Sequence, residues 1–550
     1  MEASLLKLYQ SCPSGKVKQK DIADTLQLSA KQTSRLLHKW RSEGWIRFTP
    51  GKGRGVQSSL EWLRSVEAIY EKEMEQVLKN QSVQDAAKYL LYDWSAGAKR
   101  RLTKIFQTKF GYEQDGIDKL IIPKRNPFLT FYPTEAVDAQ SANLVSNLYN
   151  RLVHVDLNGE VTAELAHSWE QNSKRLRVYL KKDVYFHDGS ILTAEDVVHC
   201  FNKVCHHPSY KKIWSPIHSI VSPAPLVVDL YTTCSYFLQL LGLLSASIYK
   251  ETNGYLYGTG SFYLEEDSAS ITVLKAFTDY FQERPLLDTI EFVQVPKDFD
   301  TIYRTSQNGD TLDTIDVQSD SGFGIVILNI CHGSSIQNLE LRHFIHALIA
   351  KHRNEIEGLN KMHHHYSANH NGFLIGYSQP YTVPQAICPK VTKPLIMEFV
   401  NYTEDITMWL KDLLEQAGIP VELRYLSFEE HLNNRCLTND ADIIVHGEIF
   451  EMNQQLSFFH FMTSDNSAVS DVVNAHPSVA RLIQHYAKTP FEEWTKLNIQ
   501  IERQCIDQSI LIPLYYEKRI IPFSTDIQNV TIKHFGYVDF SKLWMKPNIL

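Results

Sequence analysis

The fold is most tightly constrained by residues 18–43, where two short amphipathic helices are separated by a tight turn. In the segment KQKDIADTLQL, Ile22, Ala23 and Leu26 fall on one helical face, and Ser29 stands at the N-cap of the second helix. The small side chain of Ala23 allows the two helices to cross closely. The apolar stripe of the second helix has the spacing i, i+3, i+4 and i+7 and consists of Thr33, Leu36, Leu37 and Trp40. The pattern predicts a helix-turn-helix motif.

A basic hairpin follows these helices. A turn at Glu43-Gly44 leads to an apolar strand over 45–48, a glycine-rich tip PGKGRG at 50–55, and a second strand through Leu60 and Trp62. The tip does not match a phosphate-cradling loop, because no helix follows it and the GxxxxGK[ST] spacing is absent. The hairpin therefore extends the prediction to a winged helix-turn-helix domain over residues 1–65.

The second helix and the hairpin tip carry side chains suited to contact DNA. Residues 1–63 hold eleven Lys or Arg and five acidic residues, a net charge of +6. The whole chain has a formal charge of −8, so residues 64–550 carry −14. A charged helix face is often only a solvated surface. Here the cap at Ser29, the small residue Ala23 at the helix crossing and the basic hairpin together indicate that double-stranded DNA is the partner. The predicted DNA-binding residues are Lys31, Gln32, Ser34, Arg35 and His38 on the helix, and Lys52 and Arg54 on the wing.

Residues 66–115 are predicted to form a helical connector. Apolar residues recur there at helical intervals, and Gly and Pro are nearly absent. The segment could instead be a dimerisation surface, but four sustained heptads are not visible. A connector is therefore favoured, and a homodimer is left open.

From about Lys119 onward, apolar strand segments alternate with amphipathic helices. This alternation is typical of an α/β fold, and about 430 residues exceed one compact core, so two lobes are expected over residues 116–550. The expected strands are 120–125, 176–181, 289–295, 324–330, 394–400, 421–426 and 441–448, and the expected helices are 193–204, 339–350 and 406–419.

The sequence offers no support for an enzyme, a cofactor or a metal site. The motifs GxSxG, HExxH and the phosphate loop are absent, and YGTGSF at 257–262 is a weak dinucleotide match. The His199–His207 segment, with Cys200 and Cys205, is best interpreted as a polar helix end. The His363–His365 loop with His370 could bind a metal or a phosphate, but a solvated loop is favoured and its role stays open.

The N-terminus and the cysteines indicate a cytoplasmic protein. Polar residues interrupt every apolar run in MEASLLKLYQSCPSGK, which does not match a secretion signal. The most apolar stretch, residues 236–249, is too short and too polar to span a membrane. The eight cysteines are scattered without a CxxC pair, which favours reduced thiols.

Residues 143–204 resemble the family 5 extracellular solute-binding proteins. Later segments agree in the same order, including Gly258-Thr259-Gly260, Asp279-Tyr280, Asn329, Arg342 and Asp442. The resemblance covers residues 116–550 and implies an α/β, two-lobed, periplasmic-binding-protein-like (type 2) domain behind the winged helix-turn-helix domain. The signature pieces in 143–204 are Leu165-Ala166, Ser168-Trp169-Glu170, Phe186-His187-Asp188-Gly189, Thr193-Ala194 and Asp196-Val197.

A winged head on such a lobe pair resembles the SgrR-type transcriptional regulators. The resemblance includes the wing Gly53-Arg54-Gly55 and the aromatic C-terminal segment GYVDFSKLW. It implies a cytoplasmic regulator of transport or metabolism genes whose effector is a small solute, namely a sugar, a sugar phosphate or a peptide-like molecule. The alternative is the receptor component of an ABC-type peptide or sugar importer.

The solute is expected to bind between the lobes, where strands end and their loops face the crevice. Aromatic and hydrogen-bonding side chains at such positions suit a sugar or a peptide, although each could equally belong to the core. The predicted ligand-binding residues are Tyr132, Tyr257, Thr259, Asn401, Tyr402, His446, Glu448 and Phe450.

Overall fold

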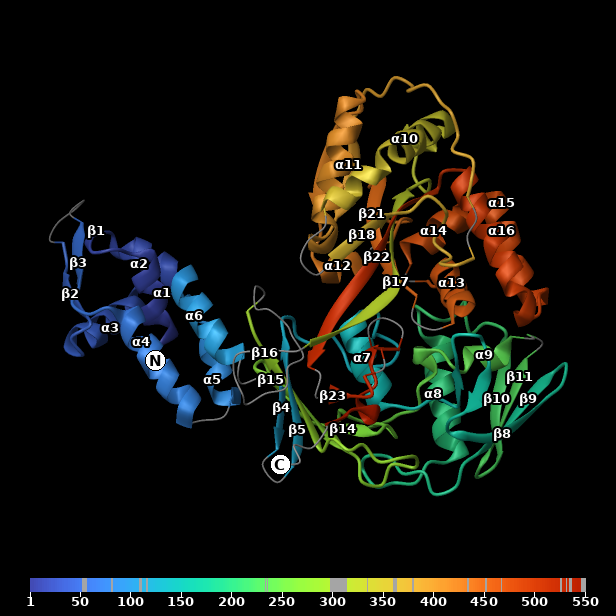
Figure 1. Ribbon diagram of the computed structural model, residues 1–550, viewed down its shortest axis with the longest axis horizontal. Helices are drawn as coiled ribbons and strands as arrows, with labels where there is room; N and C mark the ends of the chain where they lie inside the picture. The colour runs from blue at the N-terminus through green and yellow to red at the C-terminus, as the bar shows by residue number, and fades with distance from the viewer. Residues whose placement is uncertain are drawn as a thin grey trace.

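The protein is described by a computed structural model (Figure 1). The described residues are 1–51, 57–80, 83–107, 111–114, 117–232, 234, 236–296, 314–333, 335–359, 364–377, 380–432, 435–450, 453–465, 467–524, 527–530, 532–533 and 537–545.

The N-terminal head has the predicted winged helix-turn-helix arrangement. Three helices pack with a sheet in the order β1-β3-β2, in which β1 lies between α1 and α2 in the chain and β2 and β3 pair antiparallel. Its elements are α1 (Ala3–Ser11), β1 (Gly15–Val17), α2 (Gln19–Leu26), α3 (Ala30–Ser42), β2 (Ile46–Thr49) and β3 (Ser58–Trp62).

The local signals in α2 and α3 act as expected. Ser29 and Gln32 form a capping box. The Ser29 hydroxyl accepts a hydrogen bond from the backbone amide of Gln32, and the Gln32 side chain accepts one from the backbone amide of Ser29. The residues of the predicted core stripes, Ile22, Ala23, Leu26, Thr33, Leu37 and Trp40, are buried, and Leu36 is half-buried. Burial of this shared stripe fixes the angle between the two helices.

Three further helices pack on the head: α4 (Val66–Asn80), α5 (Val83–Leu90) and α6 (Ala96–Gln107). They share one apolar cluster with α1–α3, to which Tyr70, Leu90 and Leu102 contribute. The segment predicted as a connector therefore extends the core of the head. The predicted boundaries at residues 65 and 115 stay predictions.

The first lobe contains two larger sheets, ordered β14-β15-β16-β5-β4 and β10-β11-β9-β8. Their strands are β4 (Gly111–Gln114), β5 (Asp118–Lys124), β8 (Ala166–Gln171), β9 (Arg175–Leu180), β10 (Ile217–Ala224), β11 (Val227–Thr232), β14 (Phe262–Asp267), β15 (Ile271–Ala276) and β16 (Thr289–Gln294). The remaining elements are the hairpins β6 (Val153–Val155) with β7 (Val161–Ala163) and β12 (Lys250–Thr252) with β13 (Tyr255–Tyr257), and the helices α7 (Ala139–Leu148), α8 (Ala194–His206) and α9 (Phe237–Leu240).

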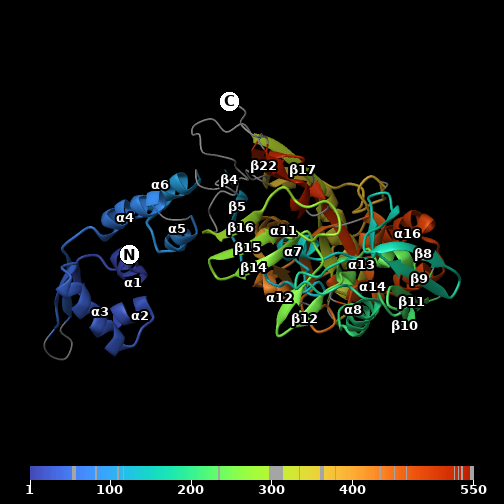
Figure 2. The ribbon, with the colours of Figure 1, turned by 90° about the horizontal axis from the view of Figure 1, so that it is seen from below.

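The head docks on the five-stranded sheet of this lobe. Alternate residues of β5 point to opposite faces, so that Leu120 and Ile122 enter the core of the lobe while Ile121 joins the cluster of the head. Helix α5 contacts β16, and Figures 1 and 2 both show α5 at this junction. The head and the first lobe are therefore joined by a continuous apolar contact.

The second lobe is built on a six-stranded sheet in the order β18-β22-β17-β21-β19-β20. Its strands are β17 (Thr314–Leu328), β18 (His364–Ala368), β19 (Leu395–Phe399), β20 (Val421–Tyr425), β21 (Ile443–Ile449) and β22 (Leu511–Ser524). Its helices are α10 (Leu339–His352), α11 (Glu404–Gln416), α12 (Phe428–Leu432), α13 (Gln454–Thr463), α14 (Ala468–Ala475), α15 (Pro477–Ile483) and α16 (Trp494–Asp507).

The two faces of this sheet belong to different cores. Val326 and Leu328 of β17 pack with α10 and α11, whereas Ile325 and Ile327 join the cluster that contains α13, α14 and α16. After β22 the chain returns to the first lobe through β23 (Ile527–Gln528), β24 (Ile532–Lys533), β25 (Tyr537–Val538) and β26 (Trp544–Met545), and Asn147 of α7 donates to the carbonyl of Val538 at 3.3 Å. The chain thus crosses between the lobes along β17 and again along β22 (Figure 1).

The motifs that carry the family resemblance hold each other in place. The Gly258 amide donates to Nδ1 of His187 at 3.1 Å, and Nε2 of the same ring lies 3.1 Å from the carbonyl oxygen of Gly260. Burial lowers the pKa of His187 to about 4, so the ring is neutral at pH 7. The two segments therefore support each other as scaffold.

Gly258→Ala is expected to destabilise the protein by about 1–3 kcal/mol or more. A Cβ at this position would overlap the carbonyl oxygen of Leu148 and the ring of Tyr149. Gly358→Ala is the matched control, because a Cβ there meets nothing within 4 Å. Urea unfolding of both variants measures the difference, and equal stability would show that the motif tolerates a side chain.

Candidate DNA-binding face and interlobe cavity

Helix α3 presents the predicted DNA-binding side chains on its outer face. Lys31, Gln32, Arg35 and His38 are exposed, and Ser34 is half-buried. The Oε1 atom of Gln32 accepts from the Ser29 amide at 3.1 Å and from the Ser29 hydroxyl at 2.7 Å. The side-chain oxygen of Gln32 is therefore used to cap the helix. Its side-chain nitrogen remains available to donate a hydrogen bond to DNA.

The wing is described only at its base. Strands β2 and β3 are tied by an ion pair between Arg47 and Glu61 at 2.6 Å. Lys52 and Arg54 lie outside the described residues, so their contact with DNA stays a prediction.

Glu2 links α3 to the helices that follow the head. Its carboxylate accepts from Nζ of Lys39 at 2.9 Å and from Nε1 of Trp40 at 3.1 Å. Its backbone amide donates to the hydroxyl of Tyr70 on α4 at 2.9 Å. Burial raises the pKa of Tyr70 to about 12, which keeps this hydroxyl neutral. The orientation of α3 is thereby coupled to α4.

A cavity of about 170 Å³ lies between the lobes. The first lobe contributes Tyr210 and two apolar loops, 136–137 and 243–245. The second lobe contributes β21, α13 and the end of α12. The cavity therefore depends on both lobes.

One face of β21 lines this cavity. Ile444, His446, Glu448 and Phe450 alternate along the chain, and all four are lining residues. Three of them were predicted from sequence as strand-end residues, but β21 continues to Ile449, so His446 and Glu448 lie within the strand. The pairing of β21 with β17 places His446 opposite Ile325 and Glu448 opposite Phe323.

A chain of polar side chains leads into the cavity. The hydroxyl of Tyr402 lies 3.3 Å from Nε2 of His431, which lies 3.2 Å from Nδ1 of His446. Nε2 of His446 lies 3.3 Å from Oε2 of Glu448. Burial lowers the pKa of His431 to about 3, so this imidazole is neutral at pH 7. Tyr402 contacts a lining residue without lining the cavity itself.

His460 of α13 is a second histidine that sequence analysis missed. Its ring stacks on that of Tyr210 with centroids 5.9 Å apart, and burial lowers its pKa. Among the described residues its buried Nε2 atom has no hydrogen-bond partner. No sequence signal separates His431 or His460 from other helical histidines, because each reaches the cavity only through the packing of its helix.

The remaining predicted ligand residues do not line the cavity. Thr259 is fully buried and donates to Oδ1 of Asn150 at 3.0 Å, because the GTG turn packs under α7. Tyr257 lies in the β12–β13 hairpin, and Asn401 is exposed after β19. The Tyr132 hydroxyl donates to Glu251 at 3.2 Å, while its carbonyl holds the turn that leads to the 136–137 loop.

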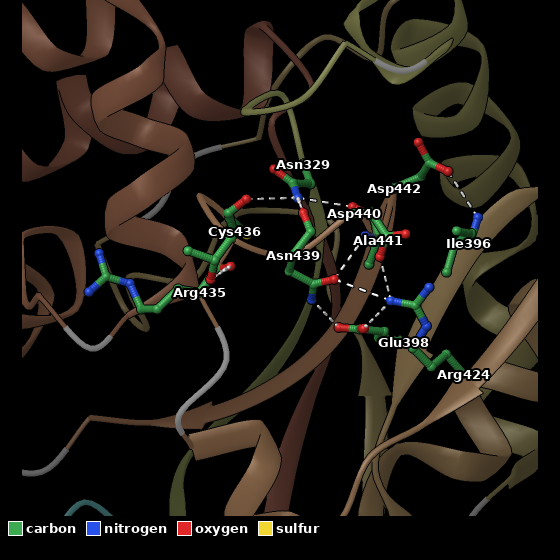
Figure 3. Close-up of polar contacts among 11 residues, drawn as sticks. Asn329, Ile396, Glu398, Arg424, Arg435, Cys436, Asn439, Asp440, Ala441 and Asp442 are labelled. Atoms are coloured by element: carbon green, nitrogen blue, oxygen red, sulfur yellow. Dashed lines mark hydrogen bonds and ion pairs between the residues drawn. The ribbon is translucent and has the colours of Figure 1, made fainter.

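The loop between α12 and β21 is anchored by the polar network in Figure 3. Nδ2 of Asn329 donates to the carbonyls of Cys436, Asn439 and Ala441 at 3.3, 3.2 and 2.9 Å. Arg424 contacts the buried Glu398 at 3.2 Å. Asn329, which belongs to a family motif, therefore holds the segment that leads into β21.

The lobes also contact each other outside the cavity. Nζ of Lys212 lies 2.5 Å from Oδ1 of Asp465, whose amide donates to the carbonyl of Ser209 at 3.3 Å. Nδ2 of Asn453 donates to the carbonyl of Leu157 at 2.9 Å. These contacts hold the lobes in a closed arrangement.

The described ranges contain no group of three or more His, Cys, Asp or Glu side chains arranged to hold a metal ion. The Cys200 thiol donates to the carbonyl of Tyr249 at 3.0 Å, and Nδ1 of His206 lies 2.7 Å from the carbonyl of Asn202. His363 lies outside the described residues, and His364 and His365 belong to β18. Within the same ranges, no helix has the length and apolar character needed to cross a membrane.

Two families match separate parts of the chain. Residues 2–113 match the family described as sugar transport-related sRNA regulator, N-terminal. Residues 160–322 match the bacterial extracellular solute-binding proteins, family 5, middle. The first match spans the winged helix together with α4–α6, and the second lies within residues 116–550.

Relatives with similar architecture cover nearly the whole chain. The HTH-type transcriptional regulator SgrR of Photorhabdus laumondii is 21% identical over 547 residues, which cover 96% of this chain and 95% of that protein. The Bacillus subtilis protein YhjP is 23% identical over 565 residues, with coverages of 96% and 95%.

Solved structures confirm the predicted fold of the lobes. The oligopeptide-binding protein AppA of Bacillus subtilis, solved with a nonapeptide, has a TM-score of 0.63 at 16% identity. The match covers 78% of this chain and 99% of the AppA chain. NikA of Brucella suis, solved with Fe(III)-EDTA, has a TM-score of 0.60 at 16% identity, with coverages of 78% and 100%. The two-lobed periplasmic-binding-protein-like fold behind a winged head is therefore established.

Acidification is expected to destabilise the protein partly through His431. Below pH 6.5 an unfolded histidine binds a proton, whereas His431 in the native state does so only near pH 3. Stability is therefore lost as the pH falls from about 6.5 toward 3. His431→Gln should reduce this loss, measured as the slope of unfolding free energy against pH.

His187 and His346 also have lowered pKa values. Part of the slope of unfolding free energy against pH will therefore remain in His431→Gln. His218→Gln, at an exposed position on β10, is the control. An unchanged slope in His431→Gln would contradict a neutral, buried His431.

Proposed function

The chain joins an SgrR-type N-terminal domain to a family 5 solute-binding domain, and from this we propose that it is a DNA-binding transcriptional regulator controlled by a small solute. The observation that carries the proposal is the winged head, with the exposed polar face of α3, packed directly on the first lobe. The role is binding rather than catalysis, and its setting is the cytoplasm, where DNA is available. Its targets are transport or metabolism genes.

The head reads DNA through α3. In helix-turn-helix proteins the second helix lies in the major groove with its N-terminal residues against base edges. Lys31, Ser34 and Arg35 occupy that part of α3, and His38 lies one turn further on. The wing residues Lys52 and Arg54 add contacts to the phosphate backbone, which contribute affinity without sequence preference.

The effector occupies the interlobe cavity and stabilises the closed lobes. Closure by hinge motion is a common way to couple a ligand to a distant site, and the two crossings along β17 and β22 provide the hinge. The motion reaches DNA through the first lobe, because the head is docked on its five-stranded sheet. The effector can shift this equilibrium only by its preference for the closed form.

A receptor for an importer is the second candidate, since AppA and NikA share the fold of the lobes. The head argues against it, because α3 keeps an outer face of cationic and hydrogen-bonding residues that transport does not require.

Arg35→Ala is expected to weaken binding to a duplex selected from a random DNA library by about 1–3 kcal/mol and to relax the preference at one base pair. The matched control is Arg100→Ala on α6, an exposed arginine whose Nε donates to Ala96 of its own helix at 3.2 Å. Fluorescence anisotropy measures both affinities. Unchanged affinity and preference in Arg35→Ala would refute the assignment of α3.

The regulator is expected to bind its operator as a homodimer. Each chain supplies one head and so recognises one half-site, and palindromic operators mirror protein symmetry. Light scattering of the complex with the selected duplex should give a mass of two chains per duplex. One chain protecting an asymmetric site would contradict the dimer.

A further inference from the structure

We propose that the effector is a small organic ammonium ion with an apolar body. The inference rests on the proposed function, in which the interlobe cavity is the effector site, and it names the chemistry of that effector. It follows from the size of the cavity, from its charge and from its aromatic walls.

The cavity is small. Its volume of about 170 Å³ is close to that of an engineered protein cavity of about 150 Å³ that binds benzene. Pockets for drug-sized ligands have about 300–1,000 Å³. With the lobes closed as observed, the cavity accommodates a ligand of benzene size, which excludes an oligopeptide.

The cavity carries one negative charge. Among the described lining residues, Glu448 is the single aspartate, glutamate, lysine or arginine. Its Oε1 accepts from the amide of Ile449 at 2.9 Å, and its Oε2 faces Nε2 of His446. In the described part of the chain, no lysine or arginine forms an ion pair with this carboxylate.

A half-buried carboxylate whose side-chain partner is the imidazole of His446, 3.3 Å away, and not a lysine or arginine, favours a cationic ligand. The side chain of Glu448 is 28% exposed, so an ammonium group can reach it from the cavity. The neighbouring His431 stays neutral because of its burial and cannot compensate the charge. A phosphate would meet this carboxylate without any lysine or arginine to bind it, which argues against a sugar phosphate.

The walls suit the rest of such a ligand. Phe450 and Phe461 both line the cavity, and their rings pack edge to face with centroids 5.8 Å apart. Aromatic rings near a cation attract it through their negative faces. Ile327 and Leu244 supply apolar contact from opposite lobes. His460 and Tyr210, whose rings stack with centroids 5.9 Å apart, complete the lining from opposite lobes.

The test compares three probes that share one branched five-carbon skeleton: isopentylammonium, isopentyl alcohol and isovalerate. Their affinities for the full-length protein are measured by calorimetry and by thermal shift at millimolar concentrations. The ammonium ion should bind about tenfold or more tightly than the alcohol, and isovalerate should bind weakest. Glu448→Gln, which keeps the shape of the side chain, should abolish this preference. Glu422→Gln, at an exposed position on β20, should retain it.

Several outcomes would overturn the proposal. These are equal or tighter binding of the alcohol or isovalerate, a preference that persists in Glu448→Gln, or no binding of the ammonium ion. The comparison of probes on the unmodified protein decides the question even if Glu448→Gln does not fold. DNA binding by the same preparation is measured in parallel, so that failure of the regulator assignment is seen separately from failure of the ligand class.

Discussion

The antiparallel pairing of β17 with β21 and β22 is the constraint on which the structure of the two lobes depends. β17 and β22 carry the chain from one lobe to the other and back, and β21 takes its register from β17. Side chains alternate along a strand, so a slip by one residue would turn Val445 and Gly447 toward the cavity in place of His446 and Glu448. At Gly324 a side chain would overlap the ring of Tyr515, so the register also depends on a close approach that only glycine permits. The proposed hinge and the proposed effector site therefore depend on the same strand pairings.

Sequence analysis predicted those features that depend on local periodicity. The cap at Ser29, the buried stripe that ends at Trp40 and the strand over 441–448 are all local features, and the structure has each of them, the last as β21. Thr259 lies outside the cavity lining, because the glycines on either side of it let the turn pack against α7. His431 and His460 could not be predicted, because their position depends on how separate helices pack.

The family motifs are explained by scaffold contacts rather than by ligand chemistry. His187 and the GTG turn hold one another, and Asn329 satisfies three backbone carbonyls of one loop. Such contacts can persist while the cavity changes its residues. A shared fold with peptide or metal-complex receptors therefore leaves the chemistry of this cavity to be read from its own lining.

The apolar docking of the head has a consequence for how the lobes can exist. Ile121, Val273 and Val293 of the five-stranded sheet are buried in the cluster of the head. If the two lobes were expressed without the head, this strip would be exposed to water, and exposed apolar patches of this kind promote self-association. The head and the lobes thus share one apolar core across their junction, and we expect the lobes to stay soluble only while the head covers this strip.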